Sequence, residues 1–406
     1  MPSSPDPVRP QVSLIGISGY ARVYYALLQE LHQQGAINLR AAAVVNPAEE
    51  PEKMAELKAQ GCSVYADYRQ MLAEHAGAID LCCIPTGIPL HAPMTIAALG
   101  AGANVLVEKP LAPTAREVEM IRVAEARSGR FVAVGFQDIY AAETIALKQR
   151  VLAGAIGQLR RIRGRGLWPR DTGYYRRNNW AGHRQLGGSW VLDSPLSNAF
   201  SHFLNLSLFF AGPATRISAP AAAVEADLLR AQQIENFDTA ALRVRAANGV
   251  EILFYVSHSS RATWEPELVF EGDGGRAIWS SGREIRLEPT GGPLERIPLD
   301  DAYAVRRTMF QQVVRKLRVP DTFVCDIAIA AEHTRCCQLA QAAPVVAVPE
   351  DWIRRERTPA GEERISIAGI EELIARAWDA GQLFREGGYP WPPPAAAEPL
   401  RPAPVL

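Results

Sequence analysis

A lysine and a histidine far apart in the chain have the side chains best suited to moving protons. Lys109 lies in the string Glu108-Lys109-Pro110, directly after the apolar run 104–107. A lysine at the end of a buried strand can serve as acid or base, because desolvation lowers the pKa of an ammonium group. His202 lies in the helical stretch NAFSHFLNLSLFF, where a neutral ring can accept a proton. The same position also suits a purely structural histidine.

A turn of small residues links the first predicted strand, from Val12, to the first helix. Its string GISGYA (16–21) has a small residue at each critical place of a dinucleotide-binding turn, although its spelling departs from G-x-G-x-x-G. Gly16 can make the tight turn, Ser18 or Gly19 can approach a pyrophosphate, and Ala21 permits close helix packing. An ordinary strand-to-helix turn is the alternative interpretation.

The end of the second predicted strand bears on the choice between NAD and NADP. Asn46 stands where an acidic residue commonly binds the adenine ribose. It can still hydrogen bond a ribose hydroxyl, while Glu49 and Glu50 repel a 2′-phosphate and no arginine follows the strand. These residues favour NAD over NADP.

Aromatic, arginine and amide side chains are concentrated in residues 168–190. Such a mixture suits a polyol, since planar polar groups bind hydroxyls and aromatic faces cover apolar ring faces. An ordinary loop or subunit contact is the alternative. The predicted substrate-binding residues are Arg170, Tyr174, Tyr175, Arg177, Asn178, Asn179 and Trp180.

The order of predicted elements gives an α/β fold. Up to about Gly135, short β-rich runs alternate with amphipathic helices, which predicts an N-terminal Rossmann domain with a parallel sheet at 1–137. For residues 138–345 the sequence predicts an α+β domain with a large, mostly antiparallel, open-faced sheet. We expect this domain to bind substrate and to mediate oligomerisation. An open apolar face favours a homodimer or homotetramer. Residues 346–406 predict an extension with one helix, 370–380, and an extended Pro-rich tail.

Composition excludes several classes of protein. The net charge of -1 provides no positive field for nucleic acid, and no apolar run approaches the roughly 20 residues that cross a bilayer. The opening MPSSPDPVRPQ has no secretory pattern, so we expect a cytoplasmic protein. The six cysteines have no zinc spacing and are expected to be buried thiols; no metal is expected. We expect structural roles for Glu235–Asp238 and His258, and a solvated or ion-paired face for Arg306, Arg307 and Arg315.

The E-K-P string and the neighbouring IPTGIPLHAP (84–93) resemble the glucose-fructose oxidoreductase, inositol dehydrogenase and MocA family over most of residues 11 to 345. The resemblance implies NAD(P)-dependent hydride transfer at a sugar or cyclitol hydroxyl carbon, with Lys109 and His202 as the proton-transfer pair. It also implies that the bond before Pro110 is often cis. Together with the glycine turn, it predicts cofactor contacts from Gly16, Ser18, Gly19, Tyr20, Ala21, Asn46, Pro85, Thr86, His91, Glu108, Lys109, Pro110 and Gln137.

The chain departs from the family motif D-x-G-x-H-x-x-D, because Asn198 and Asn205 replace both aspartates around His202. Asn198 is then the expected orienting group for a substrate hydroxyl, and Asp193 is a candidate replacement carboxylate. Two alternatives stay open. One is a redox-neutral glycosidase that oxidises a sugar transiently, and the other is a catalytically silent nucleotide sensor.

Overall fold

The computed structural model describes residues 9–391, and the Pro-rich tail predicted beyond them lies outside this range. The chain forms two compact units. Unit 1 comprises the described residues up to Ala112, with Arg116–Gly135 and Arg306–Ile327. Unit 2 comprises Pro113–Ala115, Phe136–Val305 and the described residues from Ala328. The boundaries of the three predicted domains stay a prediction.

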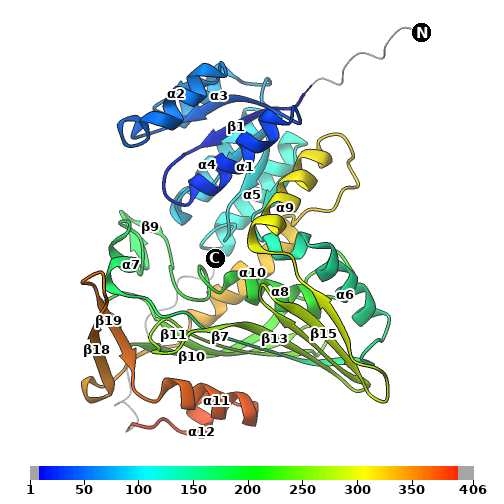
Figure 1. Ribbon diagram of the computed structural model, residues 1–406, viewed down its shortest axis with the longest axis vertical. Coiled ribbons are helices and arrows are strands. Elements are labelled where there is room, and N and C mark those ends of the chain that lie inside the picture. The colour runs from blue at the N-terminus through cyan, green and yellow to red at the C-terminus, as the bar shows by residue number, and fades with distance from the viewer. Residues whose placement is uncertain (1–8, 392–406) are drawn as a thin grey trace. The chain divides into compact units, whose positions relative to one another are not determined.

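Unit 1 is built on a parallel six-stranded sheet of order β3-β2-β1-β4-β5-β6, as predicted for a Rossmann domain (Figure 1). Strands β4 and β5 consist entirely of buried residues, which is typical of parallel strands covered on both faces. The strands are β1 (Gln11–Ile15), β2 (Asn38–Ala43), β3 (Ser63–Tyr65), β4 (Leu81–Ile84), β5 (Asn104–Val107) and β6 (Val132–Val134). The helices are α1 (Ala21–Gln33), α2 (Pro51–Ala59), α3 (Tyr68–Glu74), α4 (His91–Gly100) and α5 (Ala115–Ser128).

The strand order of unit 1 reverses between β1 and β4. Chain connections leave these two neighbours in opposite directions, which makes the carboxyl ends of β1 and β4 the switch point of the sheet. The loops that follow β1, β4 and β5 therefore end at one edge of the sheet.

Unit 2 is built on a nine-stranded sheet of order β16-β15-β14-β13-β7-β12-β11-β10-β17, which is mostly antiparallel. Two pairings, β12 with β7 and β10 with β17, are parallel. Its strands are β7 (Leu159–Leu167), β10 (Ala221–Arg230), β11 (Thr239–Ala246), β12 (Glu251–Ser257), β13 (Trp264–Gly272), β14 (Gly275–Ser280), β15 (Glu284–Pro289), β16 (Glu295–Pro298) and β17 (Val345–Ala347).

Two small hairpins and several helices complete unit 2. The hairpins are β8 (Gln185–Leu186) with β9 (Ser189–Trp190), and β18 (Ile353–Arg357) with β19 (Glu363–Ile367). The helices are α6 (Ala142–Leu152), α7 (Thr172–Arg176), α8 (Ser201–Ala211), α10 (Ile327–Ala340), α11 (Ile370–Ala380) and α12 (Phe384–Gly387), while α9 (Ala302–Lys316) crosses from unit 2 into unit 1. The C-terminal segment thus adds a hairpin and α12 to the single helix predicted there.

Helix α8 packs on the inner face of the large sheet. There Phe210 contacts Phe270 of β13, with ring centroids 4.3 Å apart. Glycines in β7 leave room for large rings: a Cβ at Gly164 would lie 2.4 Å from the ring of Phe254, and one at Gly166 2.6 Å from Phe200. The inner face of the sheet is therefore matched to specific aromatic side chains.

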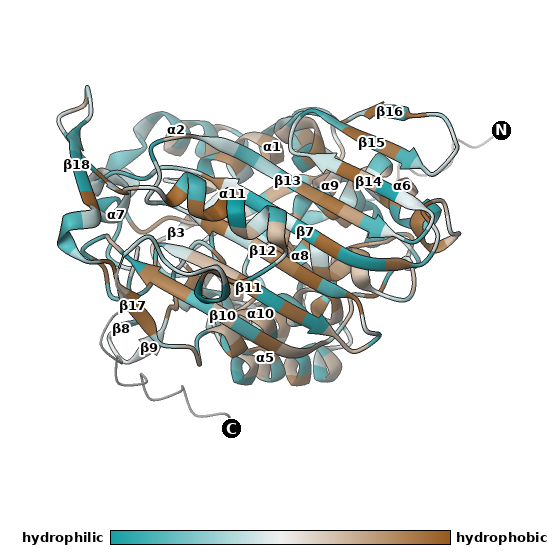
Figure 2. Cartoon of the chain, turned by 90° about the horizontal axis from the view of Figure 1, so that it is seen from below, coloured by the Kyte–Doolittle hydropathy of each residue, from teal (hydrophilic) through white to brown (hydrophobic). Residues whose placement is uncertain are grey.

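The apolar part of the outer face is not open. Helix α11 begins after Gly369 and ends before Gly381, both left-handed, and lies across β7 and its neighbours (Figure 2). Its buried residues repeat at helical spacing and pack with Tyr255 and Val269 of the sheet: Ile370, Leu373, Ile374, Ala377 and Trp378. Arg–Glu pairs occupy much of the rest, including Arg163 with Glu271 at 2.5 Å. Assembly of a homodimer or homotetramer through this sheet stays a prediction. The open apolar face from which it was inferred is covered by α11.

All six cysteines are buried free thiols, as expected. Within residues 9–391 no helix combines the length and apolar character needed to cross a membrane. The same range contains no cluster of three or more His, Cys, Asp or Glu side chains arranged to bind a metal ion.

Candidate active site

The glycine turn lies between β1 and α1 in unit 1. Gly16 and Gly19 have φ values of 95° and 58°, in the left-handed region that glycine adopts at little cost. The Gly16 N–H donates to the carbonyl of Ala43 at 2.8 Å, which ties the turn to the end of β2. The first turn of α1 contains no acidic residue, so no side chain of that turn cancels the positive end of the helix dipole. The turn fits the pyrophosphate of a dinucleotide.

The carboxylate of Glu50, the residue before α2, reaches this turn, whereas the sequence predicted only that it repels a 2′-phosphate. Lys53 Nζ donates to the carbonyl of Ile17 at 3.0 Å and to Glu50 Oε2 at 2.7 Å. The Glu50 carboxylate also hydrogen bonds to the side chain of Ser18, and the bond from Lys53 lowers the pKa of Glu50. The predicted ribose residue, Asn46, is exposed and donates instead to Glu49 Oε1 at 2.8 Å. Glu50 is thus the carboxylate nearest the turn among those after β2.

The Glu108-Lys109-Pro110 string forms the loop after β5. Buried Glu108 accepts from the Tyr24 hydroxyl and from the Lys109 backbone N–H, both at 3.0 Å. Tyr24 belongs to α1, so one carboxylate links the helix after the glycine turn to the lysine loop. Gly135 makes this possible, because a Cβ there would lie 2.8 Å from Glu108 Oε1. Burial raises the pKa of Glu108, and the Lys109 charge opposes that rise.

His91 joins the loops after β4 and β5. Its Nδ1 lies 2.6 Å from the Pro110 carbonyl oxygen, and its Nε2 lies 3.0 Å from that of Thr86. Burial lowers the pKa of His91, and the two carbonyls oppose that effect. The peptide bond between Lys109 and Pro110 is cis, as the family resemblance implies. Buried Pro85 completes the pair of loops. Unit 1 therefore brings together most of the predicted cofactor residues.

Arg306 and Arg307, two of the three arginines predicted on a solvated or ion-paired face, lie in unit 1. Arg307 forms an ion pair with Glu30 at 3.3 Å, as expected for an ion-paired face. Arg306 interacts electrostatically with the buried Glu108, where its positive charge favours the ionised carboxylate. Arg306 therefore belongs to the surroundings of the lysine loop, with a buried carboxylate in place of the surface partner expected on a solvated or ion-paired face.

His202 is the second residue of α8 in unit 2 and is half-buried. Its Nδ1 lies 3.6 Å from Oδ2 of Asp138, which follows β6 in the 3-10 turn Gln137–Tyr140. Sequence reasoning missed Asp138, because nothing in the local sequence shows that it meets His202. The predicted cofactor residue Gln137 is buried in the same turn. Asp138 thus places a carboxylate beside the His202 ring from an element other than α8.

Asn198 and Asp193 form a pair of their own. Asn198 lies in the turn before α8, and its Nδ2 donates to Asp193 Oδ1 at 2.9 Å. The other oxygen of Asp193 accepts from the Gly182 N–H at 2.7 Å. The stretch NAFSHFLNLSLFF was expected to be helical from Asn198 onward, but α8 begins only at Ser201. Asn205 is fully buried, and neither of its amide atoms has a hydrogen-bond partner within the described residues.

Several predicted substrate-binding residues do come together in unit 2. The Arg177 guanidinium lies 3.5 Å from the centre of the Tyr174 ring, and that of Arg170 lies 4.6 Å from it. The Trp180 ring lies 5.4 Å from Arg177. Asn178 has a turn role, because its side-chain oxygen accepts from the N–H of Ala181 at 2.8 Å. Exposed Asn179 follows it.

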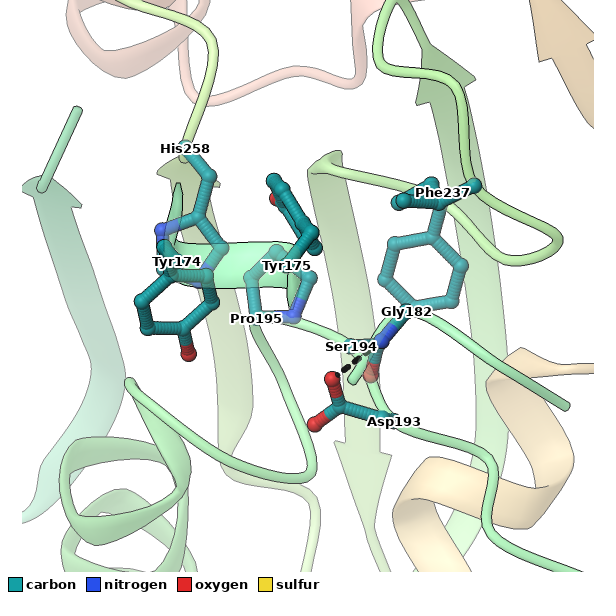
Figure 3. A pocket seen from close by; sticks show the side chains of 9 residues that line it. Tyr174, Tyr175, Gly182, Asp193, Ser194, Pro195, Phe237 and His258 are labelled. Atoms are coloured by element: carbon teal, nitrogen blue, oxygen red, sulfur yellow. Dashed lines mark hydrogen bonds between the residues drawn. The ribbon is translucent and has the colours of Figure 1, made fainter. Parts of the chain in front are cut away.

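A small pocket adjoins this cluster (Figure 3). Tyr174, Tyr175 and Asp193 all face it, and the lining side chains leave little space between them. His258, expected to be structural, lines it too. The ring of His258 hydrogen bonds to the Trp168 carbonyl at 2.9 Å, and burial lowers its pKa to about 3. The lining is Tyr174, Tyr175, Gly182, Asp193, Ser194, Pro195, Ile234, Phe237 and His258.

Comparison with known proteins identifies the family. Residues 11–136 match the oxidoreductase family with the NAD-binding Rossmann fold, and residues 144–278 match the GFO/IDH/MocA C-terminal domain. The chain belongs to the GFO/IDH/MocA oxidoreductase family. This confirms the resemblance seen in the E-K-P string.

Individual relatives of this GFO/IDH/MocA protein are distant. An inositol 2-dehydrogenase from Streptomyces avermitilis is 35% identical over 120 residues, which are 29% of this chain and 34% of that protein. The chain thus spans about a third of the length of such curated relatives. An NAD binding oxidoreductase from Klebsiella pneumoniae has a TM-score of 0.69 at 18% identity, covering 82% of this chain and 97% of that one. A levoglucosan dehydrogenase in complex with NADH and levoglucosan has a TM-score of 0.68 at 17% identity, with coverages of 82% and 96%. These structures share the fold.

Proposed function

We propose that this GFO/IDH/MocA protein transfers a hydride between NAD and a hydroxyl-bearing carbon of a sugar or cyclitol. The observation that carries the proposal is the loop after β5. Glu108 fixes the Lys109 backbone and also accepts from Tyr24 of α1, the helix that follows the glycine turn. A lysine held at the carboxyl end of a strand next to the switch point is suited to act on a substrate hydroxyl.

Lys109 and His202 share the hydroxyl proton in this proposal. When bound, NAD+ supplies the hydride acceptor for the same carbon. The neutral His202 ring accepts the proton, and Asp138, 3.6 Å away, stabilises the imidazolium that results. The nearby positive charge of Lys109 stabilises developing negative charge on the substrate oxygen.

Asn198, Asp193 and the arginine-aromatic cluster orient and select the substrate. The Asp193 carboxylate is held by Gly182 and Asn198, which fixes its direction. Selection then falls to the predicted substrate-binding residues Arg170, Tyr174, Tyr175, Arg177, Asn178 and Trp180. Their mixture of guanidinium and aromatic groups matches a ring that carries both hydroxyls and apolar faces.

NAD is the proposed cofactor in preference to NADP. Glu49 and Glu50 both follow β2, and Glu50 contacts Ser18 of the glycine turn. A 2′-phosphate on the ribose would meet these negative charges. The only cation that reaches the turn from α2 within the described residues, Lys53, is already paired with Glu50.

The test is NADH formation, followed by absorbance, with a panel that includes myo-inositol and levoglucosan. The related inositol 2-dehydrogenase and levoglucosan dehydrogenase suggest these two probes. The variant Lys109→Ala is expected to lose at least about a hundredfold in kcat/KM while its affinity for NAD, measured by calorimetry, stays within about threefold of wild type. Lys58→Ala, an exposed lysine on α2 of the same unit, is the matched control and retains full activity.

Three results contradict the proposal. Full activity of Lys109→Ala removes its central residue. Cleavage of an aryl glycoside without net NADH points to the redox-neutral glycosidase. Binding of NAD with no turnover of any polyol or glycoside points to the silent sensor.

A further inference from the structure

The hairpin β18–β19 contacts α7 in unit 2 and lies outside both ranges that match the family, 11–136 and 144–278 (Figure 1). The Thr172 hydroxyl donates to Glu362 Oε2 at 2.6 Å, and Arg176 pairs with the same carboxylate. The Glu363 N–H returns a bond to Thr172 Oγ1 at 3.1 Å. Glu362 thus joins the first and last residues of α7.

The Glu362 side chain also lies close to Gly173 of α7. A Cβ at Gly173 would lie 3.1 Å from Cδ of Glu362, so a larger residue would displace that carboxylate. Asp171 forms an isolated antiparallel bridge with Arg364 and also caps α7 by accepting from the Tyr174 N–H at 3.0 Å. A five-residue helix is not stable by itself. The position of α7 therefore depends on the hairpin.

The hairpin itself is firmly attached to the body of unit 2. Ile365 and Ile367 are buried in the core beneath the large sheet. The Ile367 N–H donates to the Ser259 carbonyl at 2.8 Å, and Gln232 Nε2 donates to the Ile365 carbonyl at 3.0 Å. The hairpin is therefore fixed to unit 2 through its buried isoleucines, and its Glu362 side chain can hold the short helix α7 in one position.

The helix so held carries two residues of the pocket lining, Tyr174 and Tyr175. The side chains that line this pocket leave little room between them, so a small shift of α7 would change the space that a ligand could enter. The size of the pocket, and the arginine stack on Tyr174, therefore follow from where α7 is held.

We propose that Glu362 is a positioning residue that fixes α7 and thereby sets the affinity of the arginine-aromatic cluster for a polyol. This inference rests on the proposed function. The C-terminal segment then determines specificity without touching the ligand, because its carboxylate acts through Thr172 and Arg176.

The experiment compares Glu362→Ala and Glu362→Gln in the full chain with the control Glu350→Gln. Glu350 precedes the same hairpin and pairs with Arg355. Hydrogen exchange followed by mass spectrometry is expected to speed up about tenfold in residues 171–176 of Glu362→Ala, with β7 unchanged. With the polyol that wild type oxidises best, KM rises about tenfold, while kcat and the KM for NAD stay within about twofold. Glu362→Gln recovers part of both effects, since an amide oxygen still accepts from Thr172.

The hydrogen-exchange measurement shows whether the hairpin holds α7, even if wild type turns over no polyol. Absence of polyol turnover would overturn the proposed function but would leave the exchange result valid. Wild-type exchange at 171–176 in Glu362→Ala overturns the inference. So does faster exchange with an unchanged KM for the polyol, or an equal rise in KM for NAD. Slower kcat alone, or the same effects in Glu350→Gln, also contradict it.

Discussion

The two units build their candidate sites in different ways. In unit 1 the residues lie in loops that directly follow β1, β4 and β5, so neighbouring strands of one sheet fix their positions. In unit 2 the pocket lining comes from stretches as far apart as Tyr174 and His258, and it depends on contacts between segments that are distant in the chain. The first arrangement suits a constant ligand such as a dinucleotide, and the second allows the lining to vary with the substrate.

Acid pH tests how strongly the unit 2 site depends on its buried surroundings. His258 is buried with its pKa lowered to about 3, by burial first and by Arg170 next. A depressed histidine pKa means that the unfolded chain binds the extra proton, so stability is present above the ordinary pKa of 6.5 and is lost as pH falls from there towards 3. Between pH 7 and pH 5 this lowers the free energy of unfolding by about 2 kcal/mol.

Urea unfolding followed by tryptophan fluorescence measures this loss, because every one of the eight tryptophans lies in unit 2. The side chain of His258→Gln cannot titrate but can still donate to the Trp168 carbonyl. The fall in the free energy of unfolding from pH 7 to pH 5 is therefore expected to be about 2 kcal/mol smaller in this variant than in wild type. His32→Gln, in α1 of unit 1, is the control and keeps the wild-type dependence. If His258→Gln also keeps it, the ring does not stay neutral in the folded unit and the argument from burial is wrong.

The same contrast explains how far sequence reasoning reached. The glycine turn, the Glu108-Lys109-Pro110 loop and the six parallel strands could be predicted, because strand ends and small residues at fixed offsets are local signals. The Asp138–His202 pair and the contact of Glu362 with Thr172 could not, since each joins residues that come together only when the large sheet and its surroundings are assembled. Glu50 was interpreted only as a repelling charge, because nothing local shows that α2 turns it towards Ser18.

A second prediction concerns the long-range pair at His202. In Asp138→Asn the 3.6 Å charge contact with the ring is lost, so the imidazolium formed during turnover is less stable. We expect kcat to fall about tenfold and the KM for NAD to stay constant. Glu143→Gln is the matched control, because Glu143 lines the same small cavity as Asp138 yet is paired with the Asp300 backbone. Equal kcat values for the two variants would show that Asp138 has no influence on the proton.

The smallest expected effect belongs to unit 1 and concerns cofactor choice. Glu50 contacts Ser18 and Lys53 at the glycine turn, so Glu50→Gln removes a negative charge beside the expected ribose position and releases Lys53 from its ion pair. Both changes favour a 2′-phosphate, and we expect the ratio of kcat/KM for NADP to that for NAD to rise about fivefold. Glu52→Gln, exposed in the first turn of α2, is the control and leaves the ratio unchanged. A ratio that responds equally to both variants would mean that net charge near α2, and not the contact with the turn, governs the choice of cofactor.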